Sequence, residues 1–144
     1  MNPDFVAFLN AFVKAQVRFL IVGAYALACY GHPRATGDLD IWIEPELENA
    51  HRVMQALIEF GAPLGNFTAA DFASAGSIFQ IGIAPIRIDL LTEITSIEFA
   101  AAWNHRTVQK LGGMEVPLIG REDLIQNKKM LGRAKDLADI EALD

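Results

Sequence analysis

Residues 38 to 44, DLDIWIE, place an aliphatic side chain at every second position. Successive side chains of a β-strand point to opposite faces of the sheet. One face of this segment then carries three apolar side chains, Leu39, Ile41 and Ile43. The opposite face begins with Asp38 and Asp40, whose Cα atoms lie about 6.5 Å apart. The segment is therefore predicted to be a strand that buries one face and presents two carboxylates on the other.

The rest of the sequence predicts helices and short strands around one sheet. Apolar residues at helical spacing, with Gly or Pro near the ends, predict helices over 2–16, 24–31, 45–60, 97–105, 121–131 and 135–143. Branched and aromatic runs predict strands over 17–22, 77–83, 85–94, 106–111 and 114–119. Residues 62 to 76 are small and irregular and predict a loop. The fold class is α/β (mixed α+β), with a mixed sheet flanked by helices.

Composition limits the class of protein. No tract of Pro, Gly, Ser or charge marks a linker in the 144 residues, so we expect a single domain over residues 1–144. The longest uncharged apolar run, residues 19 to 30, is shorter than the roughly 20 residues that span a bilayer. Without a signal-peptide pattern, a cytoplasmic location and no membrane partner are expected. The net charge of −6 argues against a broad nucleic-acid-binding surface.

A third acid, Asp89, lies in the alternating segment IRIDLL. If this strand pairs beside the strand of Asp38 and Asp40 with both apolar faces buried, three carboxylates converge. Such a set suits two divalent ions about 4 Å apart, which activate an attacking oxygen and hold a triphosphate. Two alternatives stay open: the aspartates cap a turn, or Arg34 and Arg87 balance them in a structural protein.

Two further features suit phosphate groups. The strand at 17–22 ends at Gly23 and Ala24, where a strand-to-helix turn can expose backbone N–H groups to a phosphate, although such a glycine is often only a turn. Near the C-terminus, Lys128, Arg133 and Lys135 lie among acidic residues. These cations either form ion pairs on a solvated helix face or face a phosphate.

The segments LIVGAYALACYGHPRATGDLDIWIE and IRIDLL together resemble the nucleotidyltransferase (DNA polymerase beta-like) superfamily. Its signature is a glycine turn after a strand, a D-x-D strand and a third acid on a later strand. The Gly-x-Tyr-Ala-Leu helix, PRATGDLDIWI and EDLIQNKKMLGRAKDLADIEAL are similar to small bacterial nucleotidyltransferase-like proteins. Those proteins are related to the toxins of type IV toxin–antitoxin systems.

The resemblance implies an enzyme that transfers a nucleotidyl group from a nucleoside triphosphate to an acceptor hydroxyl. The acceptor would be RNA, such as a tRNA end, or a protein, and the cofactor Mg²⁺ or Mn²⁺. A role as a toxin with an antitoxin partner follows from the narrower resemblance. The alternative is a non-catalytic module that keeps the fold and binds a nucleotide or a partner.

The resemblance also assigns roles to residues. Asp38 and Asp40 would bind both metals, and Asp89 would bind the metal that activates the acceptor oxygen or act as the general base. The nucleotide would contact six residues: Gly23, Ala24, Arg34, Lys128, Arg133 and Lys135. Ala24 departs from the family pattern, because Gly or Ser usually occupies this place.

Overall fold

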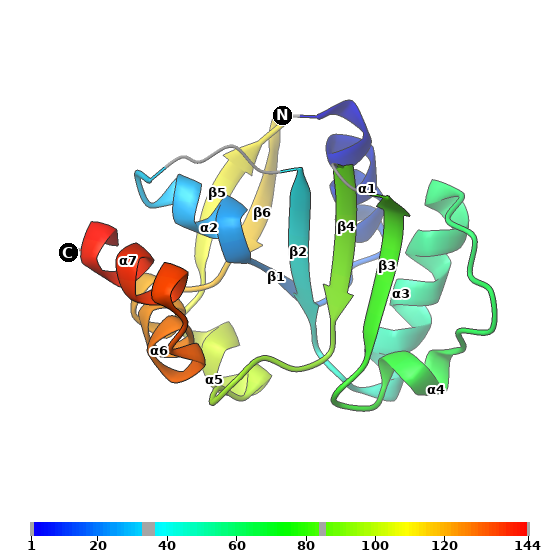
Figure 1. The fold of residues 1–144 in the computed structure, drawn as a ribbon. Coiled ribbons are helices and arrows are strands. Elements are labelled where there is room, and N and C mark those ends of the chain that lie inside the picture. Colours follow the sequence, from blue (N-terminus) through cyan, green and yellow to red (C-terminus); the bar gives the residue numbers. More distant parts are fainter. Residues whose placement is uncertain (1, 33–36, 84–85, 144) are drawn as a thin grey trace.

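The computed structural model describes residues 2–32, 37–83 and 86–143 (Figure 1). The helices of this part are α1 (Pro3–Lys14), α2 (Gly23–Cys29), α3 (Leu47–Phe60), α4 (Ala69–Phe72), α5 (Phe99–Asn104), α6 (Arg121–Leu131) and α7 (Ala134–Leu143). The strands are β1 (Phe19–Val22), β2 (Asp38–Ile43), β3 (Ile78–Ile83), β4 (Ile86–Leu91), β5 (Thr107–Leu111) and β6 (Met114–Leu118). No helix in these ranges is long and apolar enough to cross a membrane.

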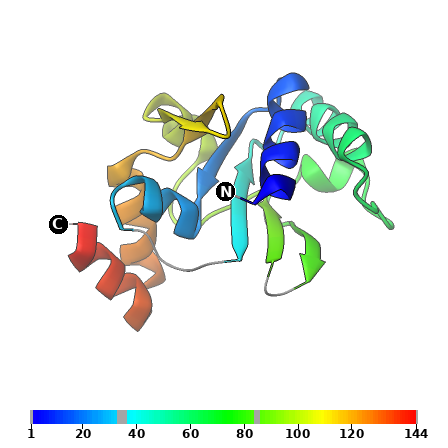
Figure 2. The same cartoon turned by 90° about the horizontal axis from the view of Figure 1, so that it is seen from above.

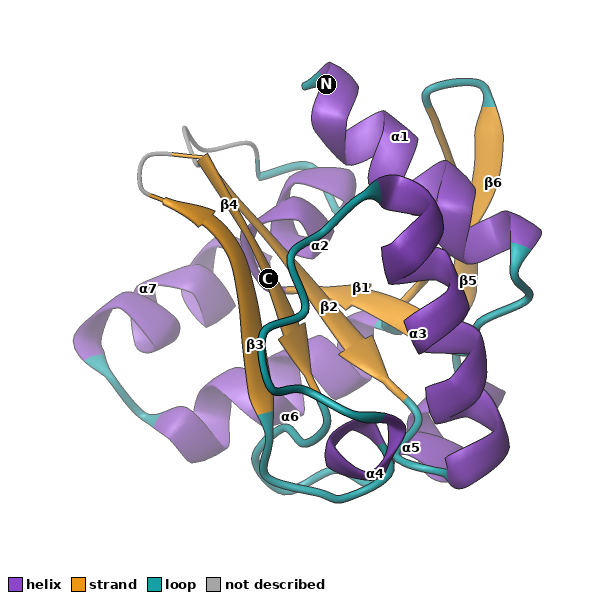
Figure 3. Ribbon diagram, turned by 90° about the vertical axis from the view of Figure 1, so that its right-hand side faces the viewer, coloured by secondary structure: helices purple, strands orange, loops and turns teal. Residues whose placement is uncertain are grey.

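The six strands form one mixed sheet in the order β3-β4-β2-β1-β6-β5 (Figures 1 and 3). Strand β2 lies in the middle, antiparallel to β1 and parallel to β4. Strand β6 is parallel to β1, and the two hairpins β3–β4 and β5–β6 form the outer parts of the sheet. The central strands β1 and β2 therefore each have a neighbouring strand on both sides, which suits their apolar sequences.

Helices α1 and α3 cover one face of the sheet (Figure 2). The Phe8 ring of α1 contacts Phe60 at the end of α3, with ring centroids 5.1 Å apart. Phe12 contacts Phe19 of β1 at 5.6 Å, which places the odd-numbered apolar residues of β1 and β2 on this face. The apolar face predicted for residues 38 to 44 is confirmed, since Leu39, Ile41 and Ile43 are fully buried here.

Helix α2 lies on the opposite face of the sheet, with α6 and α7 beside it (Figures 1 and 2). Trp42 of β2 points to this face and is buried against Phe99 of α5, with ring centroids 5.1 Å apart. The carboxylates of β2 share this face with Trp42, because their residues alternate with the buried apolar ones. Helices flank both faces, so the predicted fold class is confirmed.

The loop predicted over residues 62 to 76 is wrong in one place, because it contains the short helix α4. Thr68 caps this helix through a reciprocal pair of hydrogen bonds with Asp71. Phe72 is buried and packs against the rings of Phe67 and Phe79. A capping box and one apolar anchor are enough to form a single helical turn that periodicity cannot reveal.

Candidate active site

The three aspartates predicted to act together come from β2 and β4. The parallel pairing of these strands places Asp40 directly opposite Asp89 and Asp38 directly opposite Arg87. Side chains of directly paired residues lie on the same face, so Asp38, Asp40 and Asp89 share one side of the sheet. The strand pairing on which the predicted cluster depends is therefore present.

Gly23, the first residue of α2, lies against the Asp40 carboxylate. Its φ of +69° belongs to the left-handed region that favours glycine. A Cβ atom built on Gly23 would lie 2.2 Å from Oδ2 of Asp40. The register explains this closeness, because Val22, the residue before Gly23, pairs with Asp40. The turn predicted at Gly23 is thus part of the acid cluster, and only glycine fits it.

Arg87 bridges two of the three acids. Its Nη2 lies 3.4 Å from Oδ2 of Asp38 and 3.2 Å from Oδ2 of Asp89. Its Nε lies 2.9 Å from Oδ1 of Asp89. The sequence left the role of Arg87 open, and strand register decides it, since Arg87 is the neighbour of Asp38 across the ladder. Arg34, the other cation predicted near the acids, lies outside the described residues.

The charge at Asp40 is destabilised by its surroundings. Burial, followed by the negative charges of Asp89 and Asp38, raises the pKa of Asp40 from 3.8 to about 6. Arg87 acts in the opposite direction but does not offset these effects. A carboxylate with a raised pKa between two others is an electrostatic environment that a bound cation would relieve.

The donor set fits a hard divalent cation in kind, since all three side chains offer carboxylate oxygens. It does not form a closed cage. Across residues 2–32, 37–83 and 86–143, no three His, Cys, Asp or Glu side chains are grouped so that they could hold a metal ion. Mg²⁺ usually takes one or two carboxylates and completes its shell with water and substrate phosphates. An ion held partly by a nucleotide is therefore compatible with Asp40 and Asp89.

Two of the three C-terminal cations, Lys128 of α6 and Arg133 just before α7, pair with aspartates of α7. Nζ of Lys128 lies 2.8 Å from Asp139 and 3.7 Å from Asp136, and Lys128 is only 8% exposed. Arg133 donates from Nε and Nη2 to Asp136 at 2.5 and 3.1 Å, which lowers the pKa of Asp136. The ion pairs expected from the sequence are present, but Lys128 is buried and not on a solvated face. Lys135 is exposed. Nucleotide contacts of these three cations stay predictions.

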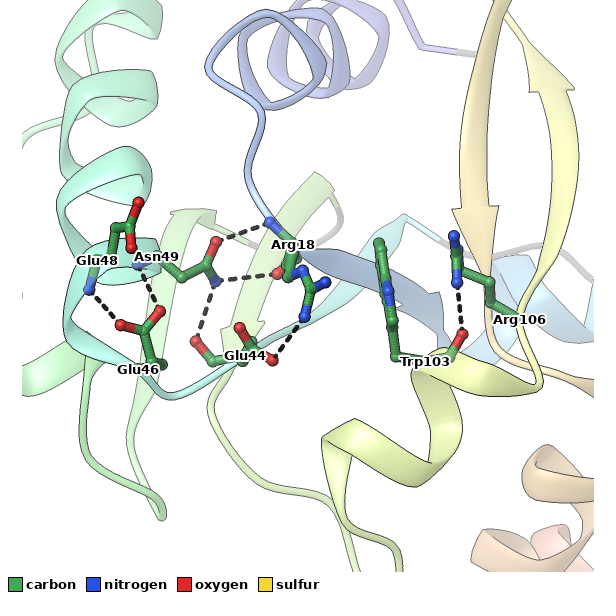
Figure 4. Close-up of polar contacts among 7 residues, drawn as sticks. All are labelled: Arg18, Glu44, Glu46, Glu48, Asn49, Trp103 and Arg106. Atoms are coloured by element: carbon green, nitrogen blue, oxygen red, sulfur yellow. Dashed lines mark hydrogen bonds and ion pairs between the residues drawn. The ribbon is translucent and has the colours of Figure 1, made fainter.

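The ends of β1 and β2 opposite the acids are fixed by Asn49 of α3 (Figure 4). Its amide accepts a hydrogen bond from the backbone N–H of Arg18 at 2.7 Å. It donates to the backbone oxygens of Arg18 and Glu44, both at 3.0 Å. The Arg18 guanidinium also pairs with Glu44 at 3.3 Å and lies over the Trp103 ring. These contacts hold β1 and β2 in their antiparallel register, which places Gly23 next to Asp40.

A cavity of about 440 Å³ lies on the acid-bearing side, further along β2. Its wall includes Trp42, whose buried indole N–H has no hydrogen-bond acceptor among the described residues. Phe99, Glu93 and Glu98 also line the cavity. The sequence did not predict this cavity, because its walls come from segments far apart in the chain.

The sequence matches no family model and no curated protein. Solved structures with a similar fold include nucleotidyltransferases. TM1012 from Thermotoga maritima, a proposed nucleotidyltransferase, superposes with a TM-score of 0.63 at 16% identity, over 99% of this chain and 93% of that chain. The lincomycin-bound lincosamide antibiotic adenylyltransferase LnuA superposes with a TM-score of 0.65 at 14% identity, over 99% of this chain and 96% of that chain. At such identities the likeness establishes the fold, and the nucleotidyltransferase-like fold expected from the sequence is confirmed.

Proposed function

We propose that this chain, which has the fold of nucleotidyltransferases, transfers a nucleotidyl group from a nucleoside triphosphate to an acceptor hydroxyl. The observation that carries the proposal is the pairing of Asp40 with Asp89, with Asp38 on the same face and Gly23 against the Asp40 carboxylate. Burial and the charges of Asp89 and Asp38 raise the pKa of Asp40, and carboxylates perturbed in this way are common at functional sites.

In the proposed reaction, the acceptor oxygen attacks the α-phosphorus. The bond from this phosphorus to the oxygen that bridges to the β-phosphate breaks, and pyrophosphate leaves with the electron pair. Asp89, which pairs with Asp40 across the two strands, would accept the proton of the acceptor hydroxyl. The turn at Gly23 and Ala24 would bind the triphosphate through backbone N–H groups, which the alanine side chain leaves unchanged.

Asp38, Asp40 and Asp89 are the proposed ligands of Mg²⁺ or Mn²⁺, and the triphosphate would complete the coordination shell, because the three carboxylates are not grouped as a metal site by themselves in the described residues. The ion would supply charge neutralisation at the phosphates and activation of the acceptor oxygen. Lys128, Arg133 and Lys135 are the proposed further contacts to the nucleotide, with Arg34. For Lys128 and Arg133, such a role requires an exchange of partners, since Asp136 and Asp139 hold both in this structure.

For the acceptor we propose RNA, such as a tRNA end, or a protein, as the sequence resemblance implies. The net charge of −6 weakens the RNA version, because RNA binding needs cations gathered against the phosphate backbone. A cytoplasmic toxin that is neutralised by an antitoxin is the biological role we propose from the same resemblance.

Transfer of label tests the proposal. The pure protein is incubated with each α-³²P-labelled nucleoside triphosphate, Mg²⁺ or Mn²⁺, and separate RNA and protein fractions of a cell extract. We expect label in one fraction, and its loss in the double variant Asp38→Asn/Asp40→Asn. The control Glu115→Gln removes an exposed carboxylate on β6 and should transfer label normally. Absence of label in every fraction, or label that persists in the double variant, contradicts the proposal.

A non-catalytic nucleotide-binding module is the second candidate function. Two observations favour it: Ala24 in place of Gly or Ser, and the guanidinium of Arg87 between Asp38 and Asp89. Calorimetry with each triphosphate and Mg²⁺ separates the two functions. Metal-dependent nucleotide binding without transfer of label would favour the module, whereas binding with transfer would exclude it.

A further inference from the structure

Arg87 lies inside the acid cluster and not at its rim. It precedes Asp89 by two residues on β4, so the two side chains share a face. Its guanidinium contacts Asp89 through Nε and Nη2 at 2.9 and 3.2 Å, and Asp38 through Nη2 at 3.4 Å. One cationic group thus spans two carboxylates of neighbouring strands, and Arg87 is 49 residues from Asp38 in the sequence.

A guanidinium between these carboxylates competes with a metal ion. Both need the same carboxylate oxygens, and two positive charges a few ångströms apart repel each other. A cation that binds between Asp38 and Asp89 must therefore displace Arg87 from at least one of them.

The Arg87 side chain can be displaced and would have a new partner. It is 31% exposed, whereas the Asp89 side chain is 11% exposed, so the arginine lies on the solvent side of the pair. Guanidinium groups bind phosphate oxygens with the same two-pronged geometry that they use for carboxylates. A triphosphate that enters with its metal would offer Arg87 such oxygens as the metal takes the carboxylates.

We propose that Arg87 is a positioning residue that occupies the cation place between Asp38 and Asp89 and moves onto the triphosphate when metal and nucleotide bind together. The inference rests on the nucleotidyl transfer proposed above and deepens it. Its consequence is a positive coupling: the metal alone binds weakly, and the metal and the nucleotide each strengthen the binding of the other.

Mn²⁺ binding followed by electron paramagnetic resonance tests this coupling. The dissociation constant of Mn²⁺ is measured with and without an ATP analogue that carries a methylene group between the α- and β-phosphorus atoms. Relative to the wild type, Arg87→Gln should bind Mn²⁺ alone about tenfold more tightly, and the effect of the analogue on Mn²⁺ affinity should shrink about tenfold. Arg52→Gln, which removes a surface pair with Glu48 on α3, is the matched control and should change neither quantity.

Arg87→Lys is the second variant, because a lysine keeps the charge but lacks the planar fork that reaches two carboxylates. It should lie between the wild type and Arg87→Gln in both quantities, and circular dichroism checks that each variant is folded. The proposal is overturned if Arg87→Gln binds Mn²⁺ alone no more tightly than the wild type, or if the wild type shows no coupling. Coupling in the wild type without transfer of label would overturn the proposed reaction and leave the role of Arg87 standing.

Discussion

At the scale of single residues, the candidate site contains a glycine that no other residue can replace and a carboxylate whose charge is disfavoured by its neighbours. Gly23 has no room for a side chain because Oδ2 of Asp40 occupies the place of a Cβ. Asp40 in turn lies between Asp89 and Asp38, and burial and these charges raise its pKa. Unfavourable charge of this kind is a cost to stability that functional sites commonly retain.

The raised pKa of Asp40 predicts how stability changes with pH. Because the folded pKa is about 6 and the ordinary value is 3.8, the folded state binds more protons than the unfolded state between these pH values. The contribution of Asp40 to the free energy of unfolding is therefore full below pH 4 and falls as the pH rises through 6, by about 3 kcal/mol at most.

Urea denaturation of the wild type and Asp40→Asn at a series of pH values from 4 to 8 checks this prediction. The variant should gain stability relative to the wild type as the pH rises, because an amide at position 40 carries no charge. Glu115→Gln, measured in parallel, controls for the removal of a surface carboxylate. A difference between Asp40→Asn and the wild type that is the same at pH 4 and pH 8 would contradict the prediction.

At the scale of elements, helix α3 shows how a polar residue can hold secondary structures together. The sequence pattern predicts that Leu47, Ala50, Met54, Leu57 and Ile58 form its apolar face. In the structure Leu47 and Ile58 are exposed, whereas Asn49 is fully buried. The helix is turned so that the Asn49 amide reaches the backbone of Arg18 and Glu44. Three hydrogen bonds satisfy this amide, which is why a polar residue is tolerated at a core position.

Asn49→Ala should lower the free energy of unfolding by about 2–4 kcal/mol, since it leaves backbone groups of Arg18 and Glu44 without their partner. Urea denaturation measures the change. Gln55→Ala, at an exposed position on the same helix, should change stability by less than about 0.5 kcal/mol. Equal small effects of the two substitutions would show that Asn49 does not hold α3 against the strands.

At the scale of the whole molecule, the net charge of −6 does not reveal which charged side chains are buried and paired. Lys128 and Arg133 have acidic partners in α7, and Lys128, Asp136 and Asp139 are buried there. A buried ion pair adds little to stability when intact, but removal of one partner leaves an uncompensated charge. The docking of α7 on α6 therefore depends on matched charges.

Lys128→Met should lower the free energy of unfolding by about 3–5 kcal/mol, because Asp139 is left buried without the Lys128 ammonium. The double variant Lys128→Met/Asp139→Leu should recover part of this loss. Lys129→Met, at the exposed neighbouring position, serves as the control and should have little effect. Thermal and urea denaturation measure these differences. A double variant that is less stable than Lys128→Met would show that the buried charge of Asp139 is not the cause of the loss.

The sequence by itself determined most of the local structure and named the acids of the candidate site. Alternation in DLDIWIE and IRIDLL defined two strands with their buried faces, because side-chain direction in a strand follows from backbone geometry alone. Glycines such as Gly61 and Gly132 marked helix ends, where the structure shows left-handed residues. The short helix α4 was missed, because a single turn has no period to detect.

Only the tertiary structure decided which of these pieces meet. The parallel register of β2 and β4 sets Asp40 against Asp89 and Arg87 against Asp38, across 49 residues of sequence. The burial of Asn49 and Lys128 likewise depends on partners from other elements. A one-residue change of register would turn every side chain of a strand to the other face. Sequence periodicity therefore names the acids of the candidate site, while strand pairing decides which charged side chains are in contact and that Arg87 is the cation between Asp38 and Asp89.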